Sequence, residues 1–187
     1  MSVMRTFSAQ SVEPQEPGQA GPGPSCRPDV LRAWQALADV ADPEIPVLSV
    51  LEMGMIADVA MDGPCVVVRM TPTFAGCPAL DVIREDIARV VRLAGFDEVR
   101  VDVVFDPPWT SDRITQEGRR KLKEFGLAPP APGCGGGAVT ETILRRVACP
   151  YCDSADTTLE SLFGPTLCRA IHYCNACRQS FEQFKPV

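Results

Sequence analysis

The chain has 187 residues, a formal net charge of −6 at pH 7 and a pI near 4.8. Domains usually contain roughly 50 to 200 residues, so this length holds one domain of about 100 residues and a small second module. The acidic balance provides no overall attraction to phosphates, which normally dominates nucleic-acid affinity. We therefore expect a two-module protein without a nucleic-acid partner.

The N-terminal region lacks the features of an export signal. Residues 1–25 contain Arg5 as their only basic group and no apolar run, whereas a signal peptide needs a basic start and about 7 to 15 apolar residues. The sequence also lacks the roughly 18 consecutive apolar residues of a membrane helix. We expect a cytoplasmic protein without membrane contact. Its nine cysteines are then metal ligands, reactive thiols or packed residues rather than disulfides.

Hydrophobic periodicity begins only after an N-terminal tail. Residues 1–27 are rich in Pro, Gly, Gln and Ser, and such a composition buries too little apolar surface to offset the entropy of ordering, so we expect disorder. Apolar residues at helical spacing over 29–41 predict a first helix. Two extended runs, 55–61 and 65–71, flank Asp62-Gly63-Pro64 and predict a β-hairpin.

A helix, a strand and a further helix are predicted after the hairpin. The spacing of apolar residues over 80–95 is helical and ends in a glycine. Residues 99–105 alternate as a half-buried strand does. The hydroxyl of Thr110 or Ser111 is expected to cap the last helix. This order of elements predicts a two-layer α+β domain over residues 28–126, with helices on one face of a three-stranded sheet.

Residues 127–145 include the stretch APPAPGCGGG. A segment of this composition is expected to act as a flexible linker to a C-terminal module at residues 146–187. Cys134 lies in this linker, and we interpret it as an incidental exposed thiol.

The C-terminal module contains two CxxC pairs separated by 21 residues. Four thiolates from two such turns can surround one ion tetrahedrally, as structural Zn²⁺ prefers. A redox CxxC would instead lie at a strand–helix junction of a βαβ unit, which this segment lacks. We therefore expect a zinc ribbon whose folding depends on its metal. The expected ligands are Cys149, Cys152, Cys174 and Cys177.

Other residues of this module leave alternatives open. Cys168 or His172 is able to replace a ligand, and Cys168 would allow iron or a cluster. The simpler hypothesis is that Cys168 is a buried small residue and that His172, the only histidine, lies on a strand surface. Asp153 follows the first pair where ribbons often have glycine, so the turn geometry stays open. Five basic and five acidic residues between 141 and 187 favour protein contact over DNA.

Cys77 and Pro78 stand where the second helix is expected to begin. Unpaired backbone N–H groups and the helix dipole stabilise a thiolate there, which makes Cys77 a candidate nucleophile or metal–sulfur ligand. A cysteine merely tolerated at a turn is an equal alternative. No histidine lies in residues 28–126, so this module lacks a Cys–His dyad. Asp42 and Glu44 are candidate ligands or acid–base groups, although in a Pro-flanked loop such residues are more often solvated turn residues.

Several segments together resemble a known family. They are residues 42–50 (DPEIPVLSV), 51–56 (LEMGMI), 71–73 (TPT), 76–78 (GCP), 106–111 (DPPWTS) and 163–168 (FGPTLC). The first four resemble the small iron-sulfur assembly domain shared with SufT-type proteins. With the last two and the ribbon, the chain after about residue 28 is similar to the D subunits, also called J, of bacterial phenylacetyl-CoA ring-epoxidising oxygenases.

The resemblance implies an accessory or maturation role in aerobic phenylacetate catabolism, beside a di-iron oxygenase component and an iron-sulfur flavin reductase. It implies that Cys77 contacts a cluster, with Asp42 and Thr73 as neighbours, and that the four ribbon cysteines bind metal. A cluster needs more thiolates than Cys77 supplies. Any transient iron-sulfur cluster there must therefore be shared, and a homodimer is one arrangement that would share it.

Four hypotheses for function remain. The first is a factor that helps insert iron-sulfur clusters or iron into oxygenase components, and the second is an integral docking subunit of the oxygenase. The third is a catalytic thiol enzyme, which lacks a base near Cys77. The fourth is a nucleic-acid-binding ribbon, which the charge disfavours. The sequence assigns no catalytic residue.

Overall fold

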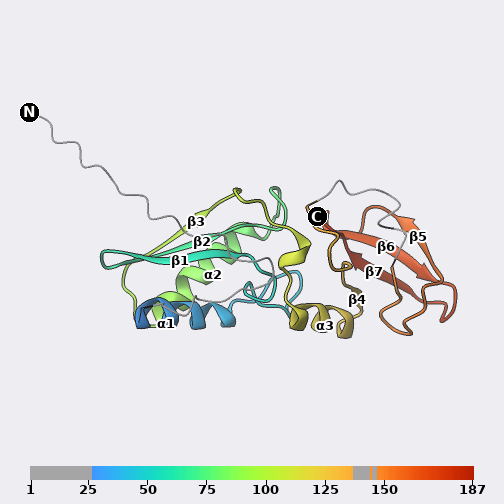
Figure 1. The fold of residues 1–187 in the computed structure, drawn as a ribbon, viewed down its shortest axis with the longest axis horizontal. Coiled ribbons are helices and arrows are strands. Elements are labelled where there is room, and N and C mark those ends of the chain that lie inside the picture. The colour runs from blue at the N-terminus through green and yellow to red at the C-terminus, as the bar shows by residue number, and fades with distance from the viewer. Residues whose placement is uncertain (1–26, 137–143, 145–146) are drawn as a thin grey trace, which may run out of the picture.

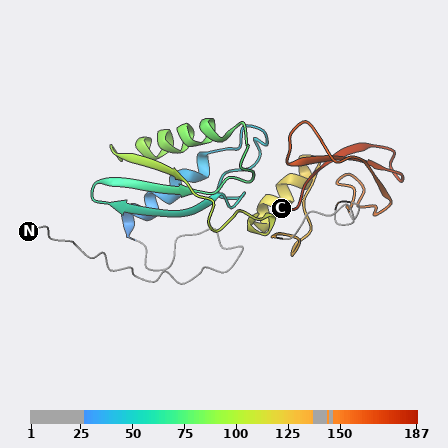
Figure 2. The same ribbon diagram turned by 90° about the horizontal axis from the view of Figure 1, so that it is seen from above.

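The first module is a three-stranded sheet with two helices packed on it (Figure 1). The structure is a computed structural model that describes residues 27–136, 144 and 147–187. The strand order is β1-β2-β3, and α1 contacts β1 while α2 contacts β3 (Figure 2). The expected α+β class is therefore confirmed. The elements are α1 (Pro28–Ala36), a 3₁₀ turn (Leu37–Asp39), β1 (Ile56–Asp62), β2 (Cys65–Met70), α2 (Leu80–Leu93) and β3 (Val99–Val103).

Two kinds of connection join the strands. β1 and β2 form the predicted antiparallel hairpin, whose turn contains Gly63 with a φ of 61°. β2 and β3 run parallel, with α2 as the crossover that parallel neighbours require. The first helix is shorter than expected, because α1 ends at Ala36 and the chain continues as a 3₁₀ turn to Asp39.

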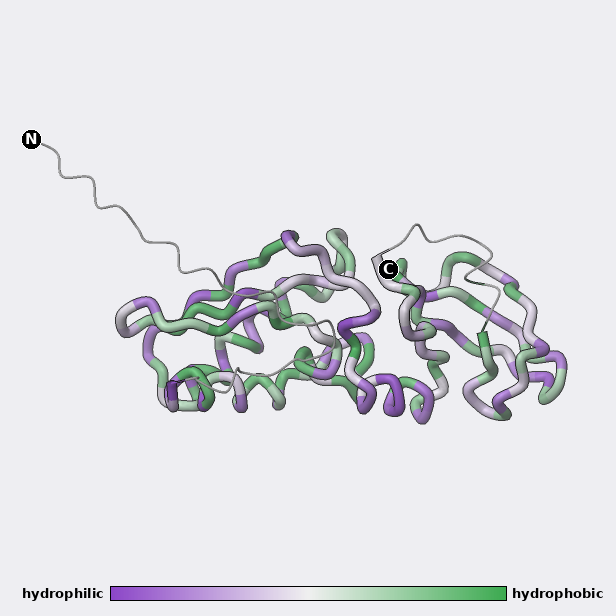
Figure 3. Tube along the Cα trace, in the orientation of Figure 1, coloured by the Kyte–Doolittle hydropathy of each residue, from purple (hydrophilic) through white to green (hydrophobic). Residues whose placement is uncertain are grey.

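The core of the first module lies between α2 and the sheet. Ile83, Ile87 and Val91 are fully buried on one face of α2, as their spacing predicts. Val66 and Val68 of β2 are equally buried, and each such side chain contributes about 1.5–3 kcal/mol. Figure 3 shows this apolar character along β2, in contrast to the hydrophilic turns of α3 (Gln116–Glu124). The loop that joins β2 to α2 therefore connects two elements that are both anchored in this core.

The second module is a four-stranded sheet of order β4-β7-β6-β5. The last three strands pair antiparallel, and β4 pairs parallel with β7. None of the helices in the described part of the chain has the length and apolar character that crossing a lipid bilayer requires. The strands are β4 (Leu127–Ala128), β5 (Thr157–Ser161), β6 (Arg169–Cys174) and β7 (Ser180–Phe184).

Helix α3 begins later than the sequence indicates. Its N-cap is Thr115, whose hydroxyl accepts a hydrogen bond from the Gly118 N–H at 3.0 Å. The expected caps, Thr110 and Ser111, instead lie at a preceding 3₁₀ turn (Ser111–Arg113). The prediction of the cap was wrong because a second hydroxyl stands closer to the helix. Thr115 also donates its N–H to the Glu52 carbonyl at 2.9 Å, which ties α3 to the first module.

Residues 127–136 make specific contacts, although their composition indicates a flexible linker. Leu127 and Ala128 are buried in β4. The Asp112 carboxylate accepts hydrogen bonds from the N–H groups of Gly133 at 2.7 Å and Gly135 at 3.0 Å. Contacts with residues distant in sequence therefore hold this segment in place, although its own composition favours no regular structure. The rest of the expected linker, apart from residue 144, and nearly all of the expected tail lie outside the described residues.

The end of the chain holds the two modules together. Phe184 of β7 is 1% exposed and belongs to the core of the first module, where its ring meets the edge of Trp109 with centroids 6.0 Å apart. The carbonyl of Val187 accepts hydrogen bonds from the N–H groups of Ser111 at 3.0 Å and Gly136 at 3.1 Å. The C-terminus accordingly lies at the junction of the modules (Figures 1 and 2).

Replacing Phe184 with alanine should destabilise the protein by about 3–5 kcal/mol, since it leaves a cavity in a shared core. Urea unfolding followed by circular dichroism measures this change. The matched control is Phe163→Ala, because Phe163 is 66% exposed, and it should change the unfolding free energy by less than about 0.5 kcal/mol. Equal effects of the two substitutions would contradict a shared core at Phe184.

Candidate functional site

The four ribbon cysteines meet at one point. The sulfur atoms of Cys149 and Cys177 are 3.7 Å apart, and those of Cys152 and Cys174 are 3.6 Å apart. All four sulfur atoms lie within 4.8 Å of one another. Tetrahedral zinc with bonds of about 2.3 Å requires sulfur separations of about 3.8 Å. The sulfur positions thus fit one tetrahedral ion, with the ligands that the sequence predicts.

Both cysteine pairs have the same backbone turn. The N–H of Asp153 donates to the Cys149 carbonyl at 3.0 Å, and the N–H of Arg178 donates to the Cys174 carbonyl at 2.8 Å. Both donors have left-handed φ values, 60° and 62°. Asp153 therefore takes the conformation for which glycine is the usual residue. The N–H of Cys177 also donates to the Cys174 sulfur, which lowers the pKa of Cys174 to about 7.

Cys77 lies in the loop before α2 rather than at its N-cap. The N-cap is Ala79, and the helix begins at Leu80. Burial raises the pKa of Cys77, and the negative charges of Asp42 and Glu44 raise it further, while a hydrogen bond from the Ala79 backbone opposes them. The expected stabilisation of the thiolate by the helix was wrong, because burial outweighs the backbone donor. The pKa of Cys77 thus lies above that of a free thiol, and two carboxylates contribute to this shift.

Asp42 shapes the turn beside Cys77. Its carboxylate accepts hydrogen bonds from the N–H groups of Glu44 at 2.7 Å and Ile45 at 3.2 Å. Asp42 is 8% exposed, so it is a buried turn-former whose charge also reaches Cys77. Asp42 is therefore a turn residue, as one alternative from the sequence has it, but a buried one rather than a solvated one.

Cys77 opens into a cavity between the two modules. The cavity has a volume of about 360 Å³. Asp42, Thr73 and Cys77 line it together, so the structure brings these three predicted residues to one place. The ribbon contributes the other wall, including Cys168 and Phe184. Sequence reasoning missed the position of Cys168, because only the docking of the modules brings that residue to Cys77.

His172 is buried rather than exposed on a strand surface. It is 0% exposed, its Nε2 lies 3.1 Å from Oε1 of Gln183, and its ring stacks on Phe181 with centroids 5.4 Å apart. Burial lowers the pKa of this imidazole. His172 alternates with Ala170 and Cys174 on the buried face of β6, which explains why the surface prediction was wrong. It is neither a member of the four-cysteine group nor part of the cavity wall.

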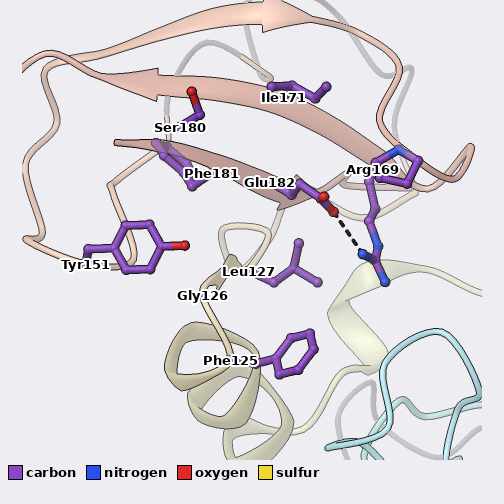
Figure 4. Close-up of a pocket in the computed structure, with 10 residues that line it drawn as sticks. Phe125, Gly126, Leu127, Tyr151, Arg169, Ile171, Ser180, Phe181 and Glu182 are labelled. Atoms are coloured by element: carbon purple, nitrogen blue, oxygen red, sulfur yellow. Dashed lines mark hydrogen bonds and ion pairs between the residues drawn. The ribbon is translucent and has the colours of Figure 1, made fainter. Parts of the chain in front are cut away.

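A second cavity lies between α3 and the ribbon sheet (Figure 4). It has a volume of about 350 Å³, and its walls include Tyr151, Phe125 and the ion pair of Arg169 with Glu182, whose closest atoms are 2.8 Å apart. The charges of Arg169 and Glu182 neutralise each other, and none of the described residues that line this cavity is a cysteine. The cavity that contains Cys77 is therefore the better candidate site.

Comparison with known proteins identifies both modules. Residues 32–103 match the family described as iron-sulfur cluster assembly protein, and residues 132–185 match the PaaD zinc beta ribbon domain. The putative D subunit of the 1,2-phenylacetyl-CoA epoxidase from Escherichia coli (strain K12) is 39% identical over 160 residues, which cover 86% of this chain and 94% of that protein. The chain belongs to this D-subunit family.

Further relatives of this D-subunit chain match about half of it. An Fe-S protein maturation auxiliary factor from Porphyromonas gingivalis (strain ATCC BAA-308 / W83) is 42% identical over 97 residues, which cover 50% of this chain and 88% of that protein. Among solved structures, a domain of unknown function, DUF59, from Bacillus anthracis has a TM-score of 0.47 and 29% identity, and the match covers 50% of this chain and 91% of that one.

Replacing Asp42 with asparagine should make Cys77 more reactive. The amide oxygen can still accept the two turn hydrogen bonds, but the lost negative charge lowers the raised pKa of Cys77. More thiolate is then present at pH 8, and alkylation by iodoacetamide should accelerate severalfold, within the limit of about tenfold for one pKa unit. Mass spectrometry of the Cys77 peptide measures the rate.

The matched control is Asp58→Asn, which removes an exposed carboxylate that pairs with Arg69 on the sheet. The alkylation rate of Cys77 should not change in this variant. Equal rates in Asp42→Asn and the unmodified chain would show that the Asp42 charge does not reach the thiol.

Proposed function

We propose that this protein is an accessory maturation subunit of a phenylacetyl-CoA epoxidase in aerobic phenylacetate degradation. It assists the insertion of iron-sulfur clusters or iron into the oxygenase and the iron-sulfur flavin reductase components. The single observation that carries this proposal is the position of Cys77 in a cavity walled by both modules. One of those modules matches an iron-sulfur cluster assembly family, and the other matches the ribbon of the D subunits.

The surroundings of Cys77 support transient metal handling rather than catalysis. Its pKa is raised by burial and by the charges of Asp42 and Glu44, so the thiol is a weak nucleophile at neutral pH until a metal displaces its proton. The only histidine, His172, is buried in the ribbon and is absent from the cavity wall. No imidazole base is thus available to Cys77 within the described residues.

The rim of the cavity supports contact with a partner protein. Phe74, Phe163 and Leu167 line it and remain 42%, 66% and 53% exposed. Exposed apolar side chains grouped at one place are typical of protein–protein contact sites. A metal bound at Cys77 would lie beside this rim, where a partner can approach it.

The same rim favours a second candidate function, an integral docking subunit of the oxygenase that transfers no cluster. This role requires a stable complex, whereas maturation requires only transient contact. Stoichiometric co-purification with the oxygenase components during turnover would support docking. A complex that dissociates once the partners are metallated would reject it.

The maturation role predicts metal-poor partners in a strain that lacks this chain. The oxygenase and reductase components, purified from that strain, should contain less than half of their normal iron and sulfide, and they should regain it when the chain is restored. Elemental analysis and sulfide assay measure these contents. Fully metallated and active components in the deletion strain would reject the maturation role.

We propose zinc as the metal of the ribbon, because four converging thiolates suit a closed structural zinc site. The purified protein should contain one zinc ion per chain, and Cys174→Ser should lose it and unfold the ribbon. The matched control is Cys134→Ser, since Cys134 lies outside the four-cysteine group. Zinc that is retained by Cys174→Ser would contradict this ligand set.

A further inference from the structure

We propose that Cys77 and Cys168 together bind iron in the cavity between the modules, with one thiolate from each module. The inference rests on the proposed role of Cys77 as an iron contact and supplies the further thiolate that such a role requires. The site therefore forms only when the two modules pack against each other, and neither module binds the iron alone.

Cys168 is held in place at the cavity wall. It lies immediately before β6, its carbonyl accepts a hydrogen bond from the N–H of Lys185 at 2.8 Å, and its sulfur lies 3.1 Å from the Thr166 hydroxyl. The neighbouring Arg169 donates to the backbone carbonyl of Glu44 at 2.7 Å. This hydrogen bond crosses the junction of the modules and fixes Cys168 beside the Asp42 turn.

Cys77 is held in place on the opposite wall. Its N–H donates to the Phe74 carbonyl at 3.1 Å, and its own carbonyl accepts from the N–H of Leu80 at 3.3 Å. Both thiols are partly buried, and both line the cavity. Each is a free cysteine, so each is available to a metal.

The electrostatics of the cavity favour a cation. Burial raises the pKa of both thiols, and the Glu44 carboxylate raises both further. The positive charges of Arg169 and Lys185 oppose part of this effect at Cys168. Arg169 is also paired with Glu182 across 2.8 Å. A bound metal cation would offset the repulsion among Asp42, Glu44 and the two thiolates.

The sulfur atoms of Cys77 and Cys168 favour a metal that binds thiolates. Thiolate ligands suit both iron and zinc, and the choice of iron rests on the proposed function. Binding of the metal releases both thiol protons to solvent. Among the described residues that line the cavity, Cys77 and Cys168 are the two thiols. A [2Fe–2S] cluster or a ferrous ion takes more ligands than two, so we propose that a partner or the nearby carboxylates supply the rest.

Anaerobic iron binding tests the proposal. The full chain with its ribbon loaded with zinc is incubated with Fe(II), with or without sulfide, and desalted, after which iron, sulfide and zinc per chain are measured. The unmodified chain and the controls Cys65→Ser and Cys134→Ser should retain iron. In Cys77→Ser and Cys168→Ser, the iron retained per chain should each time fall by at least about tenfold. Equal sulfide and iron would indicate a cluster, and iron alone would indicate an ion.

The outcomes separate this inference from the proposed function. Iron lost in Cys77→Ser but retained in Cys168→Ser would overturn the second ligand and leave the role of Cys77 intact. Iron retained in both variants would overturn both claims for the cavity. An unmodified chain that takes up no iron would overturn the inference, while metal-poor partners in the deletion strain would still support the maturation role.

A second experiment uses the unmodified chain, so a folding defect caused by a substitution cannot affect its result. Bound iron should protect Cys77 and Cys168 equally from iodoacetamide, while Cys65 and Cys134 should react at unchanged rates, as read by mass spectrometry of the four peptides. Protection of Cys77 alone would overturn the proposal.

Discussion

The burial of Phe184 against Trp109 joins two modules that would otherwise each keep their own core. Trp109 is itself fixed, because its indole N–H donates to the Met53 carbonyl at 2.9 Å. The last strand of the ribbon thus inserts into the first module beside the Asp42 turn, and Arg169 reaches across to the Glu44 carbonyl. The cavity that contains Cys77 and Cys168 exists only where these contacts hold.

Local patterns were sufficient to predict the elements and the ribbon ligands. The apolar spacing of Ile83, Ile87 and Val91 predicted α2, and the CxxC spacing predicted the four sulfur atoms that converge. Helix α2 depends on residues that are close in sequence, and the metal ligands follow from the CxxC motif alone. Element ends were less predictable, because hydroxyls such as Ser111 and Thr115 compete for the same cap.

Features that depend on distant contacts could not be predicted. Cys168 reaches the Cys77 cavity only through docking of the modules, and residues 127–136 are ordered by contacts such as those of Asp112. The pKa of Cys77 was predicted in the wrong direction, since a helix-start argument ignores burial and the nearby carboxylates. The strand position of His172 was available from alternation with Cys174, but its polarity suggested the surface.

The strand β4 follows α3 directly, yet it pairs with β7 of the ribbon. The region that matches the ribbon family starts at residue 132, after β4 has ended. A ribbon excised at that boundary would expose the backbone edge of β7 together with the ring of Phe184, and such edges recruit strands from other molecules. The part of the chain that matches the ribbon family therefore omits β4, the strand that covers one edge of β7 in the four-stranded sheet.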